Sequence, residues 1–177
     1  MNALPTARTP AATPLLRAAR NVLSVFKLRI GFMITVTALA GMVVTPGPAL
    51  GWTKILVLML AVLVSSASAG AFNQYYEHDS DRLMARTRGR VFVTGEVRHT
   101  PAWLVLIALM LAAAVLLAAG VLNPLSAAYI FLGAFFYAIV YTVWLKRRTW
   151  LNIVFGGLAG SWAVLAGATA ADPQVGA

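Results

Sequence analysis

The sequence predicts an all-α protein that crosses a membrane several times, and three observations lead to this fold class. Apolar residues make up 60% of the 177 residues, only 11% are charged, and the mean hydropathy is +0.81. A soluble domain carries about 25% charged residues, which cover its surface. The apolar residues also fall in long uncharged runs, and cysteine is absent. These features exclude a soluble enzyme, a disordered protein and a disulfide scaffold.

Five apolar stretches contain no charged residue and are predicted to form transmembrane helices. They are residues 30–45, 55–72, 102–122, 125–145 and 151–171. The last four have 18 to 21 residues, about the length that a helix needs to cross the hydrocarbon core. The first is shorter, and Lys27 and Arg29 can extend it by reaching to the interface. Helices are favoured over barrel strands because backbone in lipid has to satisfy its own hydrogen bonds.

The basic residues predict the orientation of these helices. Of the 14 Lys and Arg residues, all except Lys54 lie before the first stretch, between the second and third, or between the fourth and fifth. Basic residues accumulate in cytoplasmic loops, so we expect a cytoplasmic N-terminus. The net charge of +9 then needs no nucleic acid partner. We expect residues 1–26 to be a disordered cytoplasmic tail and residues 27–177 to form the transmembrane domain.

The acidic residues gather at one place, since four of the five lie between positions 77 and 96. If the second helix continues past Phe72, Asn73, Glu77 and Asp81 share an arc of about 80°. Carboxylates one turn apart beside an amide suit Mg²⁺, which takes one or two carboxylates and adds substrate phosphates. Arginines that can bind phosphate oxygens follow at positions 82, 86, 88 and 90. The segment predicts a site for a phosphate ester; the alternative is that the acids only neutralise a basic loop.

The segment 73–90 resembles the first aspartate-rich motif of the UbiA superfamily of membrane prenyltransferases. Within that superfamily it is most similar to the protohaem IX farnesyltransferase (haem O synthase) branch. The continuation Met84-x-Arg86-Thr87-x-x-Arg90 is specific, and the flanks at 26–29, 141–147 and 152–157 agree. The resemblance covers residues 21–171, which is nearly the whole chain.

This resemblance implies a bundle of nine transmembrane helices, of which five are present, and two sets of site residues. The Mg²⁺ ligands would be Asn73, Glu77 and Asp81; the diphosphate would contact Asn73, Arg86, Arg90 and Lys27; and the catalytic set would be Asn73, Glu77, Asp81, Arg86 and Arg90. The implied reaction is Mg²⁺-assisted ionisation of farnesyl diphosphate, with its allylic carbon captured by the vinyl group of haem B to give haem O. The metal and the arginines would stabilise charge on the leaving diphosphate.

The resemblance also implies where and with what the protein works. We expect an integral protein of the bacterial inner membrane. The expected tail, residues 1–26, favours this membrane over a mitochondrial one. Its expected partners are the lipid bilayer, farnesyl diphosphate and haem B, with haem A synthase or the terminal-oxidase assembly pathway as further ones.

Several features depart from the family pattern. Gln74 stands where many superfamily members have Asp, Ser80 stands where a bulky apolar residue is usual, and residues 161–164 replace a proline-rich stretch. After Glu96 the only acidic residue is Asp172, so the second acidic motif of the family is missing. The chain therefore resembles the amino-terminal portion of such an enzyme, and we expect it to be inactive alone.

Three alternatives remain open. The same donor chemistry could act on a quinone precursor or another aromatic acceptor. The chain could be a non-catalytic membrane fragment. It could also be part of a small carrier or channel, in which Glu77 and Asp81 line an ion path.

Overall fold

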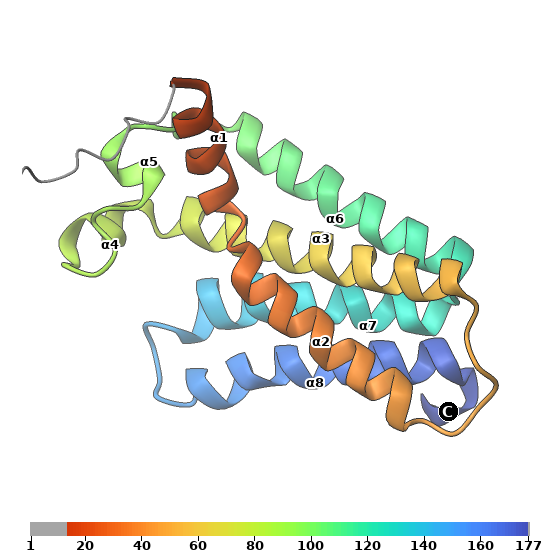
Figure 1. Ribbon diagram of the computed structural model, residues 1–177. Helices are drawn as coiled ribbons and strands as arrows, with labels where there is room; N and C mark the ends of the chain where they lie inside the picture. The colour runs from red at the N-terminus through yellow and green to blue at the C-terminus, as the bar shows by residue number, and fades with distance from the viewer. Residues whose placement is uncertain (1–13, 177) are drawn as a thin grey trace, which may run out of the picture.

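The long apolar runs form helices that lie side by side, as Figure 1 shows. The computed structural model describes residues 14–176. Its membrane-length helices are α3 (Trp52–Tyr76), α6 (Ala102–Val121), α8 (Asn152–Ala171), and α7 (Pro124–Phe135), which continues directly into the π-helix η1 (Phe136–Leu145). The all-α class and the predicted apolar helices are confirmed.

The chain bends sharply before the first predicted membrane helix. Helix α2 (Leu28–Val44) is bent by 46° from residues 18–25 of α1 (Pro14–Val25), and only together are these two segments long and apolar enough to form a broken span or a re-entrant loop. The break at 26–27 therefore lies where the expected tail meets the first predicted helix.

Helix α1 lies within the segment 1–26 that was expected to be a tail, and residues 1–13 lie outside the described residues. Pro14 is the first residue of the helix, a position that tolerates proline because its missing N–H would have no helical partner. Apolar residues then cover one side of α1, and Arg20, Asn21 and Ser24 lie on the other. Such an amphipathic pattern stabilises a helix at a boundary between polar and apolar surroundings.

The polar connections gather at one end of the bundle. The short helices α4 (His78–Leu83) and α5 (Val91–Thr94) lie between α3 and α6 and, like α1, at the same end of the long helices (Figure 1). We call this the α4–α5 end. The opposite end carries the loop 45–51, the turn 122–123 and the 3-10 helix η2 (Pro173–Gly176).

The long helices contact one another in a ring, in the order α2, α3, α6, α7, α8 and back to α2. Small residues close this ring between α2 and α8. A Cβ atom added to Gly167 would lie 1.8 Å from the Ala38 carbonyl oxygen, and one added to Gly41 would lie 2.2 Å from that of Val164. The two helix backbones are thus in direct contact, which small residues permit in membrane bundles.

Candidate functional site

Asn73, Glu77 and Asp81 lie on one helical face at the α4–α5 end. Helix α3 ends at Tyr76, but Glu77 N–H donates to Asn73 O (3.1 Å) and Asp81 N–H donates to Glu77 O (2.8 Å). The helical register therefore continues from α3 into α4. The exposed fractions of Asn73, Glu77 and Asp81 are 1%, 3% and 2%. In contrast, the Asp79 side chain is 96% exposed.

Three cations surround this acidic face, and two of them, Lys27 and Lys146, come from distant parts of the chain. Arg90 contacts Asp81 Oδ2, and its Nη1 atom lies 3.6 Å from Glu77 Oε2. Lys146, which follows η1, forms an ion pair with Glu77 Oε1. Lys27 donates from Nζ to Asn73 Oδ1 at 2.6 Å. Two buried carboxylates thus face three cations, which leaves an excess of positive charge suited to an anion.

The Asn73 amide is fixed by hydrogen bonds on both sides. Its Nδ2 group donates to Glu77 Oε2 (3.0 Å) and to Thr142 Oγ1 (3.1 Å). Buried Thr142 lies in the π-helix η1 and in turn donates its hydroxyl to Tyr137 O (2.8 Å). π-helical turns are rare and often occur at functional sites. This arrangement directs the Asn73 oxygen toward Lys27.

The loop 84–90 brings only one of the two expected arginines into the cluster. Thr87 is buried and donates its hydroxyl to Asp81 O (3.3 Å), and the chain then returns so that Arg90 reaches Asp81. Arg86 is exposed, and it forms none of the ion pairs found among residues 14–176. Arg90 therefore belongs to the cluster in this structure, whereas Arg86 lies outside it.

Lys146 and Thr142 belong to the cluster but were not predicted as site residues. Both residues lie in the flank 141–147 that agrees with the family pattern, but that agreement gave neither of them a role. For Lys146 there was a second signal: it follows the fourth apolar stretch, on the membrane side to which the charge count also assigns the acidic residues. The role of Thr142 depends on the local π-helical turn.

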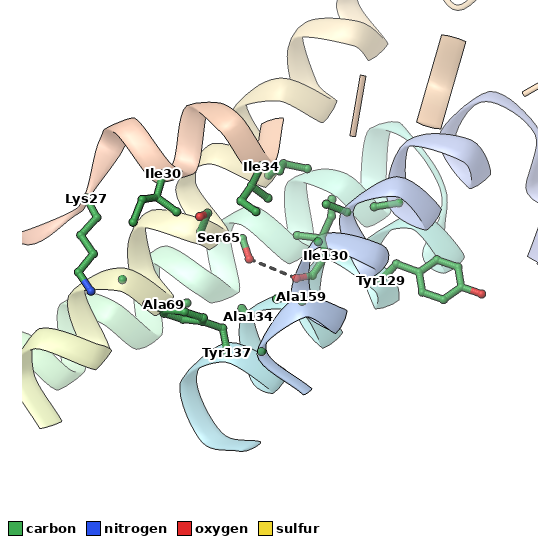
Figure 2. Close-up of a pocket in the computed structure, with 18 of the residues that line it drawn as sticks. Lys27, Ile30, Ile34, Ser65, Ala69, Tyr129, Ile130, Ala134, Tyr137 and Ala159 are labelled. Atoms are coloured by element: carbon green, nitrogen blue, oxygen red, sulfur yellow. Dashed lines mark hydrogen bonds between the residues drawn. The ribbon is translucent and has the colours of Figure 1, made fainter. Parts of the chain in front are cut away.

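A cavity of about 330 Å³ lies between α2, α3, α7, η1 and α8 (Figure 2). Pockets for small molecules commonly have about 300–1,000 Å³. Among the described residues, Lys27 is the one charged residue that lines it. Its other walls are mostly apolar and include Ile30, Ile34, Ala69, Ile130 and Ala134. The cavity therefore suits the apolar part of an amphiphile whose anionic group lies beside Lys27.

The oxygen ligands on this face suit Mg²⁺, an ion that needs only a few ligands from the protein. Glu77 and Asp81 supply carboxylates and Asn73 supplies an amide oxygen, all on one face. Within the part of the chain that the structure describes, no group of three or more His, Cys, Asp or Glu side chains could hold a metal. Mg²⁺ usually takes one or two carboxylates and completes its shell with water and substrate phosphates.

Comparison with known proteins gives consistent results. The UbiA prenyltransferase family matches residues 34–177. Protoheme IX farnesyltransferase 2 of Paramagnetospirillum magneticum is 53% identical over 152 residues, which cover 86% of this chain and 53% of that protein. Protoheme IX farnesyltransferase of Pyrobaculum neutrophilum is 40% identical over 141 residues, which cover 80% of this chain and 50% of that protein. The chain thus spans about half the length of these curated relatives. No solved structure matches it.

Proposed function

Since the chain belongs to the UbiA prenyltransferase family, we propose that it forms part of a membrane enzyme that transfers a farnesyl group from farnesyl diphosphate to the vinyl group of haem B, giving haem O. The names of its relatives, protoheme IX farnesyltransferases, support this donor and acceptor. The observation that carries the proposal is the pair of buried carboxylates, Glu77 and Asp81, surrounded by three cations beside an apolar cavity.

The donor has an anionic head and an apolar tail, and the site offers a matching region for each. Lys27 is both a neighbour of the acidic face and a wall of the cavity. The diphosphate would therefore bind beside Lys27, with Arg90 and Lys146 close by, and the farnesyl chain would extend between α2 and α8. Burial of the tail is favourable because it removes apolar surface from water.

The acidic face would hold Mg²⁺ through Asn73, Glu77 and Asp81. When bound, the ion supplies positive charge that stabilises the leaving diphosphate. During transfer, the bond between the allylic carbon and the diphosphate oxygen breaks, and its electron pair leaves with the diphosphate. The vinyl π electrons then form the new carbon–carbon bond, which leaves a carbocation on the vinyl carbon next to the porphyrin ring. A water molecule adds to this carbocation and loses a proton, which gives the hydroxyl group of haem O.

The basic residues would stabilise charge on the departing group. Lys27, Arg90 and Lys146 are held in place before the donor arrives, so little reorganisation accompanies the reaction. Arg86 would be an outer contact of the diphosphate, since it lies on the exposed loop between α4 and α5.

Binding measurements in lipid nanodiscs test this function. We expect the chain to bind farnesyl diphosphate in the presence of Mg²⁺ and much more weakly in EDTA. Haem B is then titrated into the donor-loaded chain, and its binding is followed by the change in its Soret band. Binding of a quinone precursor is measured by calorimetry in a parallel sample. Donor binding that is unaffected by EDTA would contradict the metal role. If the chain binds the quinone precursor and does not bind haem B, the proposed acceptor is wrong and the quinone precursor takes its place.

A further inference from the structure

The break between α1 and α2 lies against one short stretch of α3. Gly70, Asn73 and Gln74 are spaced three and four residues apart and therefore share a helical face. A Cβ atom added to Gly70 would lie 3.4 Å from Phe26 O and 3.5 Å from Lys27 Cβ. The break thus packs closely on α3, at the position where the acidic face begins.

Gln74 holds the end of α1 by two hydrogen bonds. Its side chain is buried, and Nε2 donates to Ser24 O (2.8 Å) and Val25 O (3.0 Å). The last carbonyls of a helix have no partner within it, so a side-chain donor is needed where the chain bends away. A carboxylate has no N–H to donate, so the aspartate that many superfamily members have at this position could not form these bonds.

Lys27 occupies a conformation that requires support. Its φ of 47° and ψ of 44° are left-handed, and it is the only non-glycine residue with positive φ in the described part of the chain. Such conformations persist where the surrounding structure holds them. Here the preceding residues are tied to α3 by Gln74, and the Lys27 ammonium is tied to Asn73.

We propose that Gln74 is a positioning residue that anchors the break and thereby holds Lys27 at the boundary between the acidic face and the cavity. The proposal rests on the proposed function, because Lys27 is the cation expected to meet the donor's diphosphate. Gln74 itself points to the α1 carbonyls and acts through Lys27.

The anchor can be tested without any substrate. The chain has no cysteine, so Leu16→Cys on α1 and Leu104→Cys on α6 give two unique sites for spin labels, both exposed. Pulsed electron paramagnetic resonance in nanodiscs should give one narrow distance distribution. Gln74→Met should broaden or shift it, and so should Gln74→Glu, which keeps the size but loses the donor. An unchanged distribution in either folded variant would overturn the anchor.

The matched control removes similar bonds at the opposite end of the bundle. Asn123 Nδ2 donates to Thr169 O (2.8 Å) and Asn123 Oδ1 accepts from Ser126 N–H (2.8 Å), so Asn123→Leu deletes two bonds between a side-chain amide and backbone, as Gln74→Met does. We expect the α1–α6 distance distribution to stay narrow in Asn123→Leu. Broadening equal to that of Gln74→Met would mean that loss of any such bond loosens α1, and would overturn the specific role of Gln74.

A double-mutant cycle tests the link to Lys27. The dissociation constant of farnesyl diphosphate with Mg²⁺ is measured for the wild type, Gln74→Met, Lys27→Met and the double variant. In the wild-type background, Gln74→Met should raise this dissociation constant roughly tenfold, which is the effect of losing one hydrogen bond to a charged group. In the Lys27→Met background, the same substitution should raise it much less. If the effects of the two substitutions on donor binding are additive, Gln74 does not act through Lys27. If the wild type binds no donor, the proposed function fails, and the distance measurement alone decides the anchor.

Discussion

Lys146 forms an ion pair with Glu77 although 69 positions separate the two residues in the chain. Lys146 follows the last residue of η1, and Glu77 lies at the junction of α3 and α4. The Glu77 side chain is 4% exposed, and Arg90 approaches its other carboxylate oxygen. A buried carboxylate is costly unless its charge is compensated, so this pair links the fourth predicted span to the acidic face.

Replacing Lys146 by methionine should weaken donor binding. The variant removes one of the three cations near the proposed diphosphate site and leaves Glu77 with less compensation. We expect the dissociation constant of farnesyl diphosphate in nanodiscs to rise about tenfold or more, because charged hydrogen bonds contribute about 1.5–3 kcal/mol. Arg148→Met removes the same charge from an exposed neighbour and should have little effect. Equal losses in both variants would indicate a general effect of charge.

Asp81 and Asp79 allow a comparison of two identical changes. Asp81 is buried beside Arg90, and Asp79 is two residues away with its side chain exposed. Asp81→Asn should abolish most of the Mg²⁺ dependence of donor binding, since it removes one of two carboxylates from the face. Asp79→Asn should retain that dependence. Calorimetric titration of Mg²⁺ into the donor-loaded chain checks both, and wild-type behaviour of Asp81→Asn would exclude it as a ligand.

Arg90 and Arg86 should differ in their effect on stability. Arg90→Gln leaves the buried Asp81 without its ion pair, and we expect the free energy of unfolding to fall by about 2 kcal/mol or more. Arg86→Gln alters an exposed side chain and should change it by less than about 0.5 kcal/mol. Thermal unfolding in detergent compares the two. Equal destabilisation would mean that the loop 84–90 follows another path.

The helices and the acidic face could be predicted because both depend on local spacing. Apolar runs of membrane length identify spans wherever they occur, and Asn73, Glu77 and Asp81 share a face as soon as α3 continues past Phe72. Helix α1 was not expected, because residues 14–25 fall within the segment 1–26 assigned to the tail. Pro14 is the first residue of the helix, where proline is tolerated.

The rest of the cluster depends on tertiary structure. Arg86 and Arg90 are equivalent in sequence, and only the buried turn at Thr87 places one at Asp81 and the other in solvent. Lys146 and Thr142 reach the acidic face because α7 and η1 pack against α3 and α8. Spacing along the chain does not specify such contacts.

The cavity provides a test that separates the donor's tail from its head. Gly160 lines the cavity, yet a Cβ atom added to it would meet nothing within 4 Å. A leucine at this position should therefore extend into open cavity space without displacing the helices. Gly120 on α6 also has open space around an added Cβ atom and is not among the residues that line the cavity. Gly120→Leu is therefore the matched control.

We expect Gly160→Leu to raise the dissociation constant of farnesyl diphosphate about tenfold, because part of the tail would have to leave the cavity and lose apolar burial. Binding of dimethylallyl diphosphate, which has the same head and a much shorter tail, should change little. Gly120→Leu should affect neither donor. If Gly160→Leu weakens both donors equally, the tail does not occupy this cavity, and the farnesyl chain must extend along another face of the bundle.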